Sequence, residues 1–168
     1  MIKMKVVNIK DICIKIFINL VISIKFSFFL KWNVMNKENR TLSASCLCKG
    51  VFMTIKGEFR PVINCHCIQC VKTHGNYAAY TSVLEENITF KSKKTLKWFK
   101  SSSKAKRGFC RTCGSSIFFK RYGSKAVSIS AGLFRNPTKL KTVSHIYIKN
   151  KRDFYKIEDN LPKYDKYT

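Results

Sequence analysis

Seven of the eight cysteines of the chain fall between positions 46 and 113, in three short motifs. The motifs are C-L-C at Cys46 and Cys48, C-H-C-I-Q-C at Cys65, Cys67 and Cys70, and C-R-T-C at Cys110 and Cys113. Thiolates at such close spacing are typical ligands of a soft metal ion. An odd number of clustered cysteines also leaves at least one thiol without a disulfide partner. The pattern therefore favours metal binding in a reducing compartment, the cytoplasm, over a disulfide framework.

The number of thiols predicts two zinc sites of different kinds. Structural zinc sites are closed by four protein ligands, whereas catalytic sites keep one position open for water or substrate. Under that rule the first and last motifs combine into a closed structural site, with ligands Cys46, Cys48, Cys110 and Cys113. Cys65, Cys67 and Cys70 then form a catalytic site with an open position. A single four-thiolate ion with three spare cysteines, or a two-metal cluster with shared thiolates, would also use these residues.

Two histidines lie close to the middle motif. His66 stands between Cys65 and Cys67, and on an extended strand its side chain would point away from both cysteines, so we expect it not to be a ligand. His74 is the nearest candidate for a fourth ligand, which would make the three-cysteine site purely structural. His66, His74 and Ser115 are also conceivable proton donors, although a structural role is the simpler expectation for each.

An open position on a three-thiolate zinc ion could accept the thiol of a small molecule. Metal coordination deprotonates a thiol at neutral pH, and a thiolate held beside an electrophilic carbon is an organised nucleophile. Arg107 and the nearby lysines would favour an anionic thiol by steering and by pairing with its carboxylates. The residues themselves therefore predict an anionic thiol and a molecule with an electrophilic carbon as partners.

Short β-strands are expected to position these motifs. Six segments are rich in β-branched or aromatic residues, and turn-forming residues lie between most of them. The turn-forming residues are Gly57, Gly75, Gly114, Gly123 and Asn136-Pro137. These segments are Val51–Ile55, Tyr77–Val83, Thr95–Lys100, Ser116–Lys120, Ala126–Ala131 and His145–Ile148. Only Cys67–Thr73 is expected to form a helical turn, ending before Gly75. The sequence thus predicts a mainly β domain of short antiparallel strands.

The first 44 residues are expected to be an extension outside the domain. Residues 12–30 are strongly apolar, but Lys15 and Lys25 would each cost about 3 kcal/mol near a bilayer centre. We expect residues 1–34 to be upstream sequence read from too early a start codon, with translation beginning at Met35. A hydrophobic anchor in residues 12–30 is the alternative, and no membrane contact is expected for the domain itself.

The chain is strongly basic, with 33 Lys and Arg against 9 Asp and Glu and a formal net charge of +24. Such a field attracts anions, although A/T-rich codon usage would also enrich lysine. The stretch K-S-K-K-T-L-K-W-F-K-S-S-S-K-A-K-R-G-F interleaves basic and aromatic residues, as nucleic-acid-binding surfaces do. A non-catalytic, zinc-stabilised module that binds nucleic acid or another anionic partner is therefore the alternative function. We expect Trp98 and Phe99 instead to pack on opposite faces of a sheet.

In order and spacing, C-L-C-K-G-V, C-H-C-I-Q-C-V-K-T-H-G and F-C-R-T-C-G-S-S-I-F-F resemble the glutathione-dependent formaldehyde-activating enzyme (GFA) family, which shares its domain with centromere protein V. Residues 128–134 and 145–164 resemble the closing segment of that family. The resemblance covers residues 45–164. Lys49 stands where the first motif usually has glycine, and Asp153 where the tail often has tryptophan.

The resemblance implies an Mss4-like, tent-shaped β-fold with two zinc ions. Position by position, it assigns the first and last cysteine motifs to structural zinc and the middle motif to catalytic zinc. It also implies the reaction of the family, in which glutathione and formaldehyde condense to S-(hydroxymethyl)glutathione, formally a carbon–sulfur lyase activity. The resemblance thus implies a zinc-dependent carbon–sulfur lyase, with glutathione or a similar anionic thiol and formaldehyde or another small aldehyde as its partners.

Overall fold

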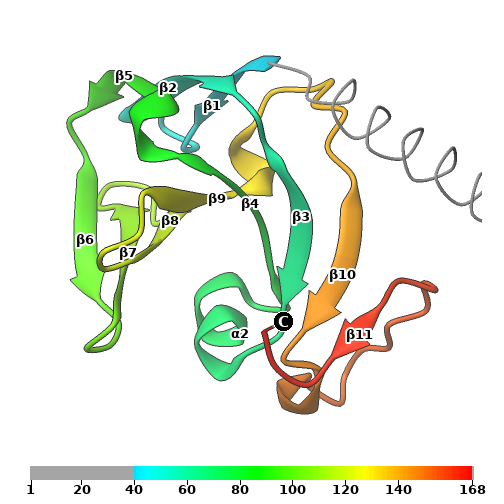
Figure 1. The fold of residues 1–168 in the computed structure, drawn as a ribbon. Coiled ribbons are helices and arrows are strands. Elements are labelled where there is room, and N and C mark those ends of the chain that lie inside the picture. Colours follow the sequence, from blue (N-terminus) through cyan, green and yellow to red (C-terminus); the bar gives the residue numbers. More distant parts are fainter. Residues whose placement is uncertain (1–39, 168) are drawn as a thin grey trace, which may run out of the picture. The chain divides into compact units, whose positions relative to one another are not determined.

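The computed structural model describes residues 40–167, and these form two β-sheets (Figure 1). The smaller sheet has the strand order β1-β2-β5 and the larger sheet the order β11-β10-β3-β4-β9-β8-β7-β6. The strands are β1 (Arg40–Ser45), β2 (Val51–Gly57), β3 (Arg60–Cys65), β4 (Ala78–Leu84), β5 (Ile88–Lys93), β6 (Leu96–Lys100), β7 (Ala105–Cys110), β8 (Ser116–Arg121), β9 (Ala126–Ser130), β10 (Thr142–Ile146) and β11 (Lys163–Tyr164). The predicted class, a mainly β domain of short strands, is confirmed.

Helical structure is sparse in the described residues. The helix α2 (Ile68–His74) follows β3 directly, and Gly75 ends it with a φ of 87°, in agreement with the predicted helical turn. Three short 3₁₀ turns follow, η1 (Glu85–Asn87), η2 (Ala131–Leu133) and η3 (Ile148–Asn150). No helix among residues 40–167 is long and apolar enough to cross a membrane. The apolar stretch at residues 12–30 and the expected start at Met35 lie outside the described residues.

Most strand pairs are antiparallel, as predicted, but two are parallel. Strand β10 runs parallel to both β3 and β11, with His145 beside Asn64. Strand β10 begins at Thr142, three residues ahead of the predicted start. It ends at Ile146, because Tyr147 takes a left-handed conformation with a φ of 58°. The parallel pairing places the C-terminal part of the chain beside β3, the strand that carries Cys65.

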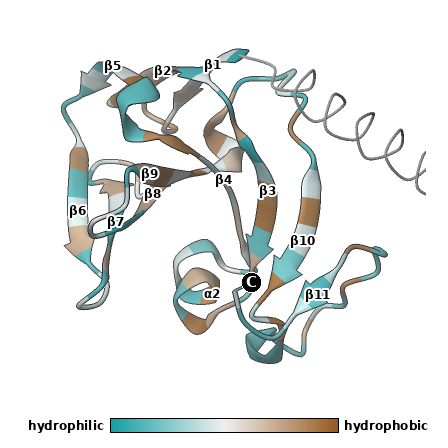
Figure 2. Cartoon of the chain, in the orientation of Figure 1, coloured by the Kyte–Doolittle hydropathy of each residue, from teal (hydrophilic) through white to brown (hydrophobic). Residues whose placement is uncertain are grey.

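The main core lies between the two sheets and is formed by alternate residues of short strands. In β2, Val51, Met53 and Ile55 are fully buried and the residues between them are partly exposed. Figure 2 shows the same alternation of apolar and polar segments along β3 and β10. Strand β1 pairs with β2 along its whole length, from Arg40 to Ser45, and contributes Ala44 to this core.

The aromatic pair in β6 is only partly packed. The Trp98 ring stacks on Phe118, with ring centroids 5.6 Å apart. Phe99, by contrast, is 61% exposed on the edge strand of the larger sheet. The expectation that both rings pack is therefore right for Trp98 and wrong for Phe99.

Candidate metal centres and cavity

The first and last cysteine motifs meet at one end of the main core. The Sγ atom of Cys48 lies 3.6 Å from that of Cys46 and 3.6 Å from that of Cys110, and Cys113 belongs to the same group. Four thiolates bound tetrahedrally at about 2.3 Å would lie about 3.8 Å apart, so the donor set fits a zinc ion. Cys46 and Cys110 are buried within the main hydrophobic cluster.

Hydroxyl and amide groups support this four-cysteine cluster. Oγ1 of Thr95 lies 3.0 Å from Cys110 Sγ, Oγ of Ser115 lies 3.2 Å from Cys113 Sγ, and the backbone N–H of Val51 donates to Cys46 Sγ. The hydrogen bond from Ser115 contributes most to lowering the pKa of Cys113 to about 5. Ser115 therefore lies at the four-cysteine cluster, not at the three-cysteine cluster, where a proton donor was conceivable.

The middle motif forms a second cluster at the junction of β3 and α2. Cys65 is the last residue of β3, Cys67 is the N-cap of α2 and Cys70 lies within its first turn. Because positions three apart in a helix share a face, Cys67 and Cys70 point the same way. The three Sγ atoms lie within 4.8 Å of one another, which fits a shared metal ion. Among the described residues, no histidine, aspartate or glutamate joins this group.

The C-x-C pairs lie at strand ends, and only Cys65 of their four cysteines is part of a strand. Cys46 and Cys48 follow the end of β1, and Cys67 follows the end of β3. Their side chains nevertheless converge, because the turns direct them to one point. The positive φ of 59° at Lys49, just after Cys48, explains why glycine suits this position in the family.

His66 points away from the cysteines on either side of it, as expected. The side chain is fully buried, with Nδ1 2.5 Å from the hydroxyl of Tyr155 and Nε2 2.8 Å from Nδ1 of His145. Nε2 of His145 in turn lies 2.9 Å from a carboxylate oxygen of Asp159. Burial lowers the pKa of His66 to about 4. This chain of hydrogen bonds holds the cysteine loop against the C-terminal segment.

His74 also lies apart from the three-cysteine cluster. Nδ1 contacts the hydroxyl of Thr73 and the backbone carbonyl of Cys70, and Nε2 lies 3.5 Å from the hydroxyl of Ser130. Both ring nitrogens thus face groups other than the cysteine sulfurs.

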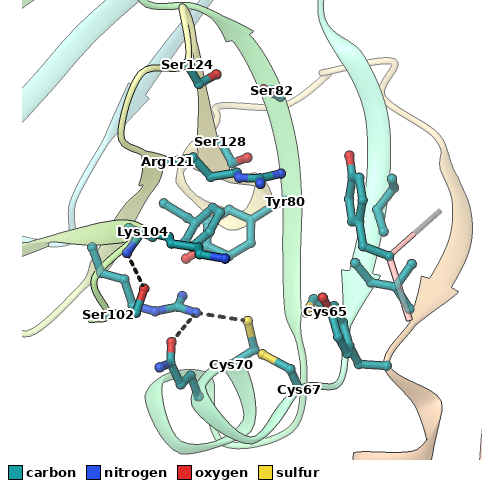
Figure 3. A pocket seen from close by; sticks show the side chains of 18 of the residues that line it. Cys65, Cys67, Cys70, Tyr80, Ser82, Ser102, Lys104, Arg121, Ser124 and Ser128 are labelled. Carbon is teal, nitrogen blue, oxygen red and sulfur yellow. Dashed lines mark hydrogen bonds between the residues drawn. The ribbon is translucent and has the colours of Figure 1, made fainter. Parts of the chain in front are cut away.

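A cavity of about 740 Å³ opens beside the three-cysteine cluster, and all three cysteines line it. The remaining lining comes from β3, α2, β4, β7, β8, β9 and the C-terminal segment. Its basic side chains, among the described residues, are Arg60, Lys104, Arg107 and Arg121, and none of the described lining residues is acidic. Figure 3 shows Lys104 and Arg121 extending into the space that Cys70 and Tyr80 border. The cavity can therefore hold an anionic molecule with its thiol at the cysteines.

Arg107 connects the cavity to the cysteines. The guanidinium Nη2 lies 3.6 Å from Sγ of Cys70 and 3.3 Å from Oε1 of Gln69, contacts drawn as dashed lines in Figure 3. Hydrogen bonds from Cys65 and Cys70 lower the pKa of Cys67, and the charge of Arg107 acts in the same direction. Nothing in the sequence pattern indicates these contacts, because Arg107 is 37 positions from Cys70.

Comparison with known proteins agrees with the cysteine pattern. Residues 41–150 match the family described as glutathione-dependent formaldehyde-activating enzyme. An uncharacterized lyase from Schizosaccharomyces pombe is 26% identical over 113 residues, which cover 66% of this chain and 81% of the yeast protein. A Rhodobacter sphaeroides protein of known crystal structure matches with a TM-score of 0.47 and 19% identity, over 60% of this chain and 99% of the bacterial one. With its two cysteine clusters and a family match over most of its length, the chain belongs to the glutathione-dependent formaldehyde-activating enzyme family.

Proposed function

We propose that the protein is a zinc-dependent carbon–sulfur lyase that adds glutathione, or a similar anionic thiol, to formaldehyde or another small aldehyde. One observation carries this proposal: a cluster of three thiols, with no fourth ligand among the described residues, lines a basic cavity. A closed site would have no position for a substrate thiol. Family membership and the yeast relative, whose name includes lyase, support the same class of reaction.

The two clusters would have different roles in this function. Cys46, Cys48, Cys110 and Cys113 would hold structural zinc, since two of them are part of the main core. Cys65, Cys67 and Cys70 would hold the second zinc at the cavity wall. Zinc bound there would supply a positive centre that favours the thiolate form of a substrate thiol.

The cavity would select and orient the thiol substrate. Its volume falls within the range of small-molecule sites, and a tripeptide fits this range. Lys104 and Arg121 extend into it without an acidic neighbour in the described lining, so they would pair with substrate carboxylates. With the thiol held at one wall, an aldehyde that enters the same cavity meets the sulfur at close range.

The cellular compartment can be inferred from the cysteines of the two clusters. All seven cysteines of the described residues are free, and free metal-binding thiols need a reducing environment. We therefore place the active protein in the cytoplasm.

The test compares the full chain with its Cys67→Ser variant. Zinc content is counted per chain, and hemithioacetal formation from glutathione and formaldehyde is followed by NMR. The proposal predicts two ions and catalysis for the unmodified chain, and a folded protein with one ion and no catalysis for Cys67→Ser. Cys13→Ser, which alters the cysteine outside the three sequence motifs, should keep both ions and the activity. Loss of folding in Cys67→Ser would show that the second site is structural.

A second candidate function, binding of single-stranded nucleic acid, has one specific observation in its favour. Phe99 is 61% exposed on β6, and Lys106 lies 4.5 Å from the ring of its neighbour Trp98. Exposed aromatic rings beside lysines can stack with bases while the lysines contact phosphates. The stretch from Asn87 to Arg152 contains no acidic residue to oppose such binding.

A further inference from the structure

The last described residues of the chain reach the mouth of the cavity. Strand β11 pairs in parallel with β10, and the chain then turns back toward the ends of β3 and α2 (Figure 1). Tyr167 lines the cavity and is also 57% exposed, so its ring lies at the boundary between the cavity and the solvent. Residues 165–167, the C-terminal strap, therefore lead from β11 to the rim of the cavity.

The strand register places the C-terminal strap at the level of the three-cysteine cluster. Cys65 of β3 lies opposite Ile146 of β10, which in turn lies opposite Tyr164 of β11. Neighbouring strands are about 4.8 Å apart, so Tyr164 is about 10 Å from Cys65 across the sheet. The strap begins at the next residue, and both Cys65 and Tyr167 border the same cavity. A molecule of sufficient length can therefore extend from the cysteines to the strap.

Few contacts hold the strap against the rest of the domain. Strand β11 has only two residues, and the carboxylate of Asp165 lies 2.9 Å from Nζ of Lys149. Both of these side chains are exposed, and an exposed ion pair contributes little to stability. The side chain of Tyr167 makes no hydrogen bond, ion pair or ring contact with any other residue in the range 40–167. Segments with so few contacts open more readily than the core, so the strap can move aside and return.

The surroundings of the strap suit an anionic molecule beneath it. Arg60 lies in the cavity lining, within electrostatic range of the Tyr167 phenol. Asp165 is the acidic residue of the strap, and its charge is neutralised by Lys149, so it does not repel an anion. A molecule in the cavity would also cover part of the Tyr167 ring that is exposed, and burial of aromatic surface is favourable.

We propose that the C-terminal strap closes on the bound thiol and that Tyr167 selects thiols long enough to reach it. The proposal rests on the proposed function, which places the substrate sulfur at the three-cysteine cluster. A tripeptide held there extends along the cavity to the mouth, where its remote part packs against the Tyr167 ring. A two-carbon thiol such as 2-mercaptoethanol ends short of the mouth and makes no such contact. Closure of the strap slows the departure of the longer thiol.

The test uses the zinc-loaded full chain and three variants of it. Tyr167→Ala removes the ring, and Tyr167→Phe keeps the ring without its hydroxyl. Phe154→Ala is the control, because Phe154 is 69% exposed and lies outside the cavity lining. Glutathione affinity is measured by calorimetry, and KM and kcat with formaldehyde are measured for glutathione and for 2-mercaptoethanol. Hydrogen–deuterium exchange of the peptide that contains residues 163–167 shows whether the strap closes.

The proposal predicts that glutathione slows exchange in residues 163–167 of the unmodified chain. Tyr167→Ala should weaken glutathione binding and raise its KM about tenfold, the effect expected for loss of one aromatic contact. Its kcat, and its KM for 2-mercaptoethanol, should change by less than about twofold, because the ring contacts only the remote part of the longer thiol. Tyr167→Phe and Phe154→Ala should keep the affinity of the unmodified chain, and zinc content should be the same in all four proteins.

Two results would overturn the proposal. Exchange in residues 163–167 that glutathione leaves unchanged would show that the strap does not close on the thiol. An affinity for glutathione that Tyr167→Ala preserves, or that it lowers equally for both thiols, would show that Tyr167 does not select between them. Failure of the proposed function gives a different result. The unmodified chain would then bind glutathione and slow exchange in the strap without accelerating the reaction with formaldehyde, which would support the strap and reject the lyase activity.

Discussion

The Nε2 atom of His66 lies 2.8 Å from the Nδ1 atom of His145, so the cysteine loop and β10 are joined through two buried imidazoles. Nε2 of His145 donates to the carboxylate of Asp159, because an ionised carboxylate only accepts. The other ring nitrogen of His66, Nδ1, lies 2.5 Å from the hydroxyl of Tyr155. A chain of four side chains thus runs from a carboxylate at the surface to the cysteine loop.

Replacing His145 with alanine should destabilise the protein, because it leaves buried His66 without one of its partners. Loss of a partner from a buried polar group costs about 1–3 kcal/mol. We expect a decrease of that size in the free energy of unfolding, measured by urea denaturation of the zinc-loaded chain. Lys156→Ala, an exposed change in the same C-terminal segment, should alter it by less than about 0.5 kcal/mol. Equal stability of the two variants would refute the structural role of His145.

Replacing Lys49 with glycine should stabilise the protein. Lys49 has a φ of 59°, a conformation that costs a residue with a Cβ atom about 1–2 kcal/mol. Glycine recovers most of that cost and loses part of it through its greater freedom in the unfolded state, so we expect a net gain of about 0.5–1 kcal/mol.

Lys97→Gly is the matched control for this effect, since Lys97 is an exposed lysine in the extended strand β6. There the same replacement should destabilise the protein by about 0.5–1 kcal/mol. Melting temperatures that shift in the same direction for both variants would contradict the explanation from the positive φ.

Replacing Cys110 with serine should prevent folding, whereas Cys67→Ser should not. Cys110 is fully buried in the main core, and a structural zinc site contributes its binding free energy to folding. The serine variant should lose the cooperative thermal transition seen by circular dichroism, and a strong chelator should have the same effect on the unmodified chain. A cooperative transition that survives both treatments would show that the four-cysteine cluster does not support the fold.

The second candidate function makes its own prediction for Phe99. If β6 binds single-stranded DNA, Phe99→Ala should weaken binding by about 1–3 kcal/mol, and binding should decrease steeply with salt. Phe154→Ala, which removes a phenylalanine that is 69% exposed in another segment, should leave affinity unchanged. Binding that is absent at low salt, or that depends equally on both rings, would eliminate the β6 surface as a nucleic-acid interface.

The cysteine clusters were predictable because the information lies in short spacings. A C-x-C or C-x-x-C pair brings two sulfurs together within one turn. The remaining question is which motifs share one ion, and the requirement of four ligands for a closed zinc site predicts the grouping of four and three cysteines. The strands with alternating apolar residues, such as β2, were predictable for the same reason. Strand β7 was not predictable, since Lys106, Arg107 and Gly108 interrupt the alternation of apolar and polar residues.

The surroundings of the clusters depend on contacts between distant segments. His145 meets His66 only because β10 pairs in parallel with β3, and nothing in either segment specifies that pairing. Arg107 reaches Cys70 only because β7 lies beside α2 at the cavity wall. Next to Arg107, Gly108 allows the Phe118 ring to pack closely, since a Cβ atom at position 108 would lie 2.9 Å from that ring. Local spacing therefore predicts the cysteine clusters, and topology supplies the residues around them.

The number of sulfur ligands per zinc tests the central claim most directly, and X-ray absorption spectroscopy of the zinc-loaded full chain measures it. Seven cysteines shared between two ions give a mean of about 3.5 sulfur ligands per zinc, and a glutathione thiol at the second site would raise the mean to about 4. A mean that stays constant on addition of glutathione would contradict the account, because the three-cysteine site would then have no position for a substrate thiol.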